Sequence, residues 1–230
     1  MLSTFSLPLG SLAGIYGDSL SDDGTASGAP LPYQMESPLI RAADAAALGS
    51  ASVTARAGVG TAPAARTRFI NRAINGSTIS AVISQFNSSF PSNVYTHLIF
   101  AIGTNERTRS RAQTQADITT LSASIPSGIP ALVIGPAAWG WLYPGPNVIA
   151  GANDTRLNET NTDLLTLFVA SHANTLYVDL RTPLWTTQTP PGTTNGLTAD
   201  GQDMTVDGIH WTPAGRAAAW AVISPFVTFT

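Results

Sequence analysis

The sequence predicts a three-layer α/β/α sandwich built around a parallel β-sheet of about five strands. One observation is that about five short apolar runs recur along the chain, and each ends in glycine or polar residues. Another is that helical apolar spacing follows most of these runs, and strands alternating with helices form right-handed, parallel βαβ units. Finally, 230 residues without a Pro/Gly/Ser-rich linker fit one domain, which we expect to span residues 1–230.

The first two predicted strands lead into polar or helical segments. An apolar run over residues 12–16 stops at Gly17, and a dense group of aspartates and serines follows it. We expect a helix over residues 38–48. The second strand, residues 68–71, precedes a segment whose apolar residues between positions 79 and 86 have helical spacing.

The remaining predicted elements alternate in the same way. In chain order they are strand 97–102, helix 112–123, strand 131–134, helix 155–173 and strand 176–179. Long loops follow the strands at 131–134 and 176–179. Pro213 opens a last helix, because proline favours the first helical turn.

The composition excludes several classes of chemistry. All 11 basic residues are arginine, so Schiff-base chemistry and a phosphate-loop lysine are excluded. The absence of cysteine excludes thiol catalysis, disulfides and cysteine metal sites. The net charge is -3 and the arginines are scattered, except for a group at Arg107, Arg109 and Arg111 that we interpret as a solvated face. We therefore expect no nucleic-acid partner.

The sequence shows neither a membrane span nor a signal peptide. No run approaches ~20 apolar residues, and the first residues lack a basic region before an apolar core. These observations predict either a cytoplasmic protein or a secreted protein whose signal has been trimmed. They do not predict an oligomeric state.

Polar residues with catalytic potential follow the predicted strands. Since the carboxyl ends of parallel strands share one edge of a sheet, we expect these residues to lie on one rim. Serine hydrolysis needs a hydroxyl, an imidazole, a carboxylate that orients the imidazole, and donors for the oxyanion. Each role has a candidate among the residues Asp18, Ser19, Asn75, Gly76, Gly103, Thr104, Asn105, Asp207 and His210.

At these positions the sequence resembles the SGNH (GDSL) hydrolase family of esterases and lipases. The matching stretches are GDSLSD at 17–22, NRAINGST at 71–78, GTNE at 103–106 and DGIHWTPAG at 207–215. They occur in the family's order and each follows a predicted strand or precedes the last helix. Glu106 stands where the family more often has aspartate.

The resemblance implies a flavodoxin-like fold and a role for each matching residue. Ser19 would be the nucleophile, His210 the base and Asp207 the residue that orients His210. The backbone N–H groups of Ser19 and Gly76, with the Asn105 side-chain amide, would form the oxyanion hole. The reaction implied is hydrolysis of a carboxylic ester without a cofactor.

Each assignment has a structural alternative. Ser19 could cap a helix, and Gly76 could simply relax a tight turn. Asp18 is interpreted as a structural residue that fixes its turn. Of the other two histidines, His97 is interpreted as a core or strand-start residue, and His172 ends a helix, where a cation suits the dipole.

Other functions fit the sequence less well. A metallophosphoesterase needs several histidines at the rim. The α/β-hydrolase fold needs a G-x-S-x-G elbow, which the sequence lacks. A carbohydrate-binding module without turnover would leave the triad unexplained, and an acyltransferase of the same family remains an alternative to the hydrolase.

An aromatic group predicts the substrate class. Trp139, Trp141 and Tyr143 lie in the loop after the strand at 131–134, Trp211 directly follows His210, and Trp185 lies in another loop. If at least two of them line the site, they shorten the acyl channel and offer a stacking surface for a sugar. We therefore expect acetyl to butyryl esters as substrates, among them acetylated carbohydrate.

Overall fold

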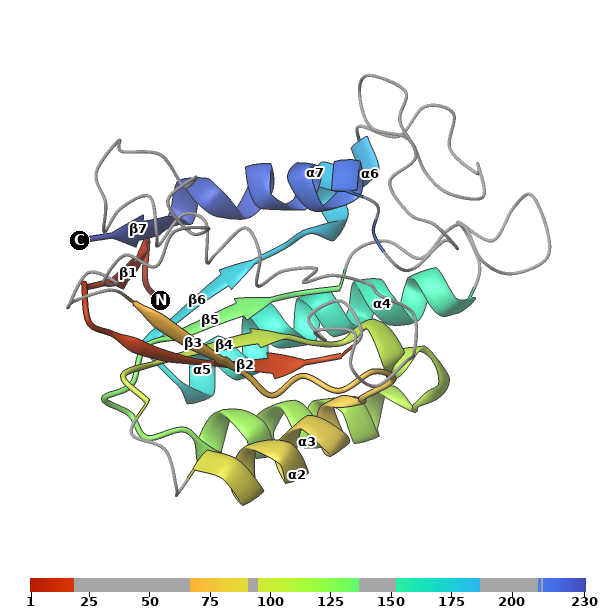
Figure 1. The fold of residues 1–230 in the computed structure, drawn as a ribbon. Coiled ribbons are helices and arrows are strands. Elements are labelled where there is room, and N and C mark those ends of the chain that lie inside the picture. Colours follow the sequence, from red (N-terminus) through yellow and green to blue (C-terminus); the bar gives the residue numbers. More distant parts are fainter. Residues whose placement is uncertain (19–66, 91–94, 137–151, 187–210, 212) are drawn as a thin grey trace.

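Five parallel strands form the main sheet of the protein (Figure 1). The computed structural model describes residues 1–18, 67–90, 95–136, 152–186, 211 and 213–230. The strands are β2 (Leu12–Gly17), β3 (Arg68–Asn71), β4 (His97–Ala101), β5 (Ala131–Ile134) and β6 (Thr175–Val178). This confirms the predicted parallel sheet. The helix expected over 38–48 lies outside the described residues.

The strand order is β3-β2-β4-β5-β6, which is the flavodoxin-like order. The chain runs from β2 outward to β3 and then returns to the other side of β2 to form β4. The connections therefore diverge between β2 and β4, and open α/β sheets bind ligands at the carboxyl ends of such a pair. Gly17 pairs with Ala101, and Ala101 pairs with Ile134, so these strands end at the same level.

Helices cover both faces of the sheet, which confirms the three-layer sandwich (Figure 1). On one face lie α2 (Ile79–Ser89), α3 (Arg111–Ser124) and α4 (Ala152–Asp163). On the other lie α6 (Arg181–Thr186) and α7 (Pro213–Ile223). Two buried clusters fill these interfaces. The first holds residues such as Tyr16, Phe86 and Phe100, and the second holds residues such as Ile15 and Ile99.

Alternation along the strands explains why the two clusters are distinct. Ile15 and Ile99 point to the α7 side, whereas their neighbours Tyr16 and Phe100 point to the α2 side and stack at 5.7 Å. Because the sheet is covered on both faces, its central strands β2, β4 and β5 are continuous apolar runs. This is the pattern that made them visible in the sequence.

Several elements differ from the prediction. The expected helix over 155–173 is α4, then a π-helical turn, η5 (Leu164–Phe168), and the short α5 (Val169–Ser171). The stretch after β6, predicted as a loop, begins with α6. A separate parallel pair, β1 (Phe5–Leu7) and β7 (Val227–Phe229), was not predicted.

The sequence suggested that the group of Arg107, Arg109 and Arg111 is a solvated face, but two of these side chains are held by carboxylates. Arg109 contacts Asp117 through a 2.5 Å hydrogen bond, and Arg111 donates two hydrogen bonds of 3.0 and 2.9 Å to Asp163. Both guanidinium groups keep part of their surface in water but are fixed by carboxylates. The pair from Arg111 connects α3 to the end of α4.

Candidate active site

The structure describes part of the predicted site. Gly76, Asn105 and Trp211 are among the described residues. The predicted triad of Ser19, Asp207 and His210 lies outside the described residues, as do the loop aromatics Trp139, Trp141 and Tyr143. The described chain nevertheless includes Asp18, directly before Ser19, and Trp211, directly after His210. Trp185 lies in α6.

The segment after β3 runs beside the end of β2. The backbone N–H of Arg72 donates to the carbonyl of Ile15 at 2.7 Å, and that of Ile74 donates to Gly17 at 3.2 Å. These bonds continue the strand pairing past the end of β3. They bring the turn that contains Gly76 to the carboxyl end of β2, where Asp18 is buried and Ser19 follows.

Gly76 has a left-handed backbone, with φ of +74°. Among the described residues beyond its chain neighbours, no heavy atom lies within 4 Å of the Cβ position, so the backbone conformation and not lack of space disfavours a side chain. The glycine is exposed, and its neighbour Ser77 is buried. Gly76 therefore does serve a tight turn, and that turn presents backbone at the rim.

Asn105 lies in the 3₁₀ turn η3 (Thr104–Thr108), directly after β4. Its Nδ2 donates to the backbone carbonyl of Ser77 at 3.1 Å. The structure thus brings together the turns of Gly76 and Asn105, although the two residues are 29 positions apart in the sequence. An amide nitrogen has two hydrogens, so one remains for a second acceptor.

Gly103 makes the Asn105 turn possible. Its φ is +108°, and a Cβ would lie 2.9 Å from Thr160 Cγ2 and 3.0 Å from Pro136 Cδ. Both conformation and space therefore exclude a side chain at this position. The close approach lets η3 pack against α4, which helps to fix the turn.

Glu106 is a functional candidate for which the sequence predicted no role. Its carboxylate is fully buried, with 0% exposure. Oε1 accepts the backbone N–H of Ile79 at 2.7 Å, and Oε2 accepts the Thr114 hydroxyl at 3.0 Å. The Arg109 Nε lies 3.1 Å from Oε2. In the sequence, Glu106 is a single polar residue after a strand, and nothing there indicates these contacts.

A second buried network lies at the end of β5. Asn161 donates from Nδ2 to the carbonyl of Pro136 at 3.1 Å, and the Tyr177 hydroxyl donates to Asn161 Oδ1 at 2.5 Å. Burial raises the pKa of Tyr177, so the phenol stays neutral and remains a donor. The network fixes the backbone at the end of β5, on the same edge as the Asn105 turn.

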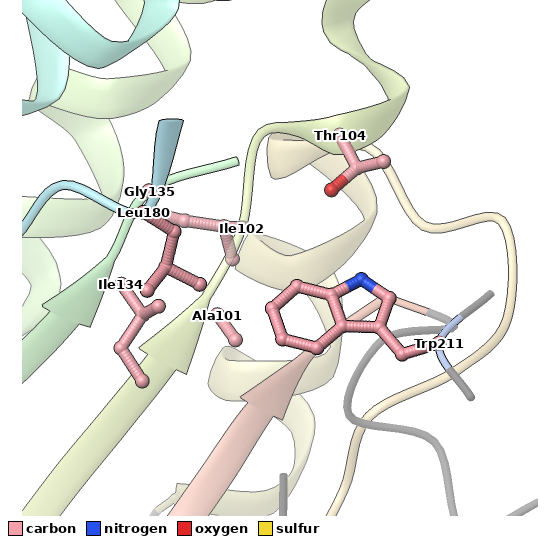
Figure 2. Close-up of a pocket in the computed structure, with 7 residues that line it drawn as sticks. All are labelled: Ala101, Ile102, Thr104, Ile134, Gly135, Leu180 and Trp211. Atoms are coloured by element: carbon pink, nitrogen blue, oxygen red, sulfur yellow. The ribbon is translucent and has the colours of Figure 1, made fainter. Parts of the chain in front are cut away.

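Trp211 forms the wall of a small apolar hollow at this edge (Figure 2). Its six-membered ring is directed toward Ala101 and Ile102, and its nitrogen edge lies toward Thr104. The enclosed part has room for about one water-sized group. The lining residues are Ala101, Ile102, Thr104, Ile134, Gly135, Leu180 and Trp211.

The two described histidines have structural roles. His97 begins β4, at the opposite end of the strand from Asn105, and is 8% exposed. Its Nδ1 lies 2.9 Å from the Thr96 hydroxyl. His172 follows α5, is buried, and contacts Thr175 and the Pro126 carbonyl at 3.0 and 3.2 Å. These positions confirm the interpretations from the sequence, and they leave His210 as the candidate base among three histidines.

The fold and its rim define a flavodoxin-like α/β sandwich with a polar constellation at the β2–β4 switch point. The model of the GDSL-like Lipase/Acylhydrolase family matches residues 15–222. The chain therefore belongs to this family and is an ester hydrolase. The match begins within β2 and extends into α7, so it includes residues of all five strands of the main sheet.

Solved structures with the same fold share little sequence with this chain. A lipase/acylhydrolase from Enterococcus faecalis has a TM-score of 0.62 at 18% identity, and the alignment covers 94% of each chain. A catalytic mutant of an acetylxylan esterase from Geobacillus stearothermophilus has a TM-score of 0.63 at 14% identity, covering 94% of this chain and 93% of that one. No curated protein sequence matches the chain.

A G-D-S-L family protein from Veillonella parvula is also similar, with a TM-score of 0.60 at 15% identity, covering 94% of this chain and 97% of that one. At these identities the likeness concerns the fold. Within the part of the chain that the structure describes, no helix is both long and apolar enough to cross a membrane.

Proposed function

We propose that the protein is a serine esterase that hydrolyses short-chain carboxylic esters through an acyl-enzyme on Ser19. The observation that carries this proposal is the bond from Asn105 Nδ2 to the Ser77 carbonyl, 3.1 Å long. It joins a side-chain amide to the exposed Gly76 turn at the switch point of the sheet. Two donors from separate elements at one place are what an oxyanion hole requires.

In the proposed mechanism, Ser19 Oγ attacks the ester carbonyl while His210 takes the hydroxyl proton. Asp207 holds the imidazole in the tautomer that can accept this proton. The backbone N–H groups of Ser19 and Gly76 and the Asn105 amide stabilise the negative charge on the carbonyl oxygen. His210 then gives its proton to the leaving alcohol, and water, activated by the same base, releases the acid and regenerates Ser19.

The hollow beside Trp211 supports a preference for short acyl groups. It is apolar and small, and Trp211 is only 5% exposed, so the indole acts as a fixed wall. Since Trp211 directly follows His210, this wall belongs to the same segment as the proposed base. An acetyl methyl suits a space of this size, whereas a long chain requires the wall to move.

Acetylated carbohydrate is the natural substrate that we propose. The loop aromatics Trp139, Trp141 and Tyr143 would offer stacking surfaces for sugar rings. The similarity in fold to the acetylxylan esterase from Geobacillus stearothermophilus is consistent with this proposal. An acyltransferase with the same site would pass the acyl group to a second alcohol, and analysis of the products in the presence of a sugar alcohol distinguishes the two.

Replacement of the nucleophile tests the proposal. Ser19→Ala should fold normally and lose ester turnover, because the chain offers no thiol or lysine as a substitute nucleophile. Activity of the purified variant is compared with that of the wild type on p-nitrophenyl acetate, butyrate and dodecanoate. Substantial turnover by Ser19→Ala would refute the mechanism, and fast hydrolysis of monomeric dodecanoate by the wild type would refute the short acyl site.

A further inference from the structure

We propose that Glu106 is a positioning residue that sets the geometry of the oxyanion hole. Its buried carboxylate holds the beginning of α2 against the turn that carries Asn105, and so fixes Gly76 relative to the Asn105 amide. This inference rests on the proposed function, because it assumes that Gly76 and Asn105 are the oxyanion donors.

Glu106 joins three parts of the chain. Oε1 accepts the N–H of Ile79 at the first position of α2, at 2.7 Å. Oε2 accepts the hydroxyl of Thr114 in α3 at 3.0 Å, and Arg109 Nε lies 3.1 Å away. A fully buried carboxylate is costly unless it is paired and hydrogen-bonded. These contacts offset the desolvation, and the positive end of the α2 dipole adds to them.

Asn105 and Glu106 bind the same short segment at two points. Asn105 binds the carbonyl of Ser77, and Glu106 binds the N–H of Ile79, two residues further on. Two consecutive residues of one turn therefore hold the end of the Gly76 turn, one by binding a backbone carbonyl and the other by binding a backbone N–H. Ser77 is held further by Gln85, whose Nε2 donates to its hydroxyl at 2.7 Å.

Gly76 itself is exposed, and among the described residues beyond its chain neighbours no heavy atom lies within 4 Å of its Cβ position. The helix that follows begins with a weak cap, since Thr78 accepts the Ala81 N–H at 3.4 Å. The Ser77 N–H closes the Gly76 turn by donating to the Ile74 carbonyl at 3.2 Å, and the bonds just after the turn hold it in place. The Glu106 bond and the Gln85 bond, both 2.7 Å long, are the shortest of these.

An amide cannot replace this carboxylate without loss. Glu106 accepts from donors at both oxygens, whereas a glutamine would turn an NH₂ group toward one of them. Its NH₂ would then face either the Ile79 N–H or the guanidinium of Arg109. Glu106→Gln should therefore keep the side-chain volume but loosen the Gly76 turn, and a shift of about 1 Å between groups at a reaction centre costs about 10²-fold in rate.

The experiment compares Glu106→Gln with the wild type on p-nitrophenyl acetate. We expect kcat to fall about 10²-fold while KM changes by about two-fold or less, because the loss appears in the transition state. Asp163→Asn is the matched control. Asp163 is also a buried carboxylate that accepts from an arginine, Arg111, and from Gln115, and in the described part of the chain none of its hydrogen bonds is to the 76–79 segment. The Asp163→Asn variant should keep kcat within about three-fold of the wild-type value.

A double-mutant cycle with Asn105→Ala separates positioning from general stability. If Glu106 acts through the oxyanion hole, Glu106→Gln should cost much less in the Asn105→Ala background than in the wild type. Additive effects would overturn the inference, as would an equal loss in Asp163→Asn. An unchanged kcat in the single variant Asn105→Ala would refute the proposed oxyanion hole. A reduced kcat in Asn105→Ala together with an unchanged kcat in Glu106→Gln would refute only the positioning role of Glu106.

Thr114→Val provides the test if Glu106→Gln does not fold. It removes the hydroxyl that donates to Oε2 and keeps the shape of the side chain. We expect a fall in kcat of about five- to ten-fold at unchanged KM, again smaller in the Asn105→Ala background. An unchanged kcat in a folded Thr114→Val protein would count against the role of Glu106.

Discussion

Replacing Asn105 by alanine should damage catalysis far more than it damages the fold. The Asn105 side chain has one role in the structure and a second, separate role in the proposed mechanism. It donates to the Ser77 carbonyl at 3.1 Å, and we propose that its second N–H faces the oxyanion. The substitution removes both, so its effects on stability and on turnover can be measured independently.

The structural task sets the expected loss of stability. Ser77 is 6% exposed, so Asn105→Ala takes a donor from a largely buried carbonyl. Such a loss costs about 1–3 kcal/mol in the free energy of unfolding. Urea denaturation followed by circular dichroism measures it, and the protein should remain folded at 25 °C.

The catalytic task sets the expected loss of turnover. Removing one oxyanion donor costs about 10²–10³ in kcat, or about 2.7–4 kcal/mol in the transition state. KM should barely change, because the ground-state carbonyl does not carry the full charge. Steady-state kinetics on p-nitrophenyl acetate measures both constants. A variant that loses stability but keeps kcat within a few-fold would refute the reasoning and make Asn105 a turn residue only.

Gly103→Ala should lower the free energy of unfolding by about 2 kcal/mol or more, because φ is +108° and the new Cβ would lie 2.9 Å from Thr160 Cγ2. Urea denaturation measures this loss, and a stability equal to that of the wild type would contradict the prediction. Burial lowers the pKa of His97 below its usual 6.5, so the free energy of unfolding should decrease as the pH falls below 6.5, by up to about 1.4 kcal/mol per pH unit. Urea titrations at a series of pH values should show that His97→Gln removes this dependence on pH. The same dependence in His97→Gln would exclude His97 as its source. Trp211→Leu should widen the hollow and raise the hydrolysis of hexanoate relative to acetate several-fold, and an unchanged ratio would show that Trp211 does not limit the acyl chain.

The central strands β2, β4 and β5 could be predicted from the sequence because they are buried on both faces, whereas the edge strand β3 is only half-buried. The central strands are continuous apolar runs, and glycine or a polar residue follows where the chain leaves the sheet. The proximity of the Gly76 and Asn105 turns could be predicted for the same reason, since parallel topology brings the strand ends to one edge. Neither inference required knowledge of individual contacts.

The missed features depend on contacts that leave no local pattern. The strands β1 and β7 have three residues each, too few for alternation to be recognised, and each is stabilised by a partner at the other end of the sequence. Glu106 is a single acidic residue in a polar turn, so its burial depends wholly on α2 and α3. The ion pair of Arg111 with Asp163 joins residues 52 positions apart.

The pairing of β1 with β7 has a consequence for the newly made chain. Phe5 and Leu7 are fully buried, and they pair with Val227 and Phe229. The hydrogen bond between Ser6 and Thr230 spans 224 positions. At about 5–20 residues per second, a ribosome needs roughly 10–45 seconds to make that length. For this time the first strand has no partner, so Phe5 and Leu7 reach their buried positions only when synthesis of the chain is nearly complete.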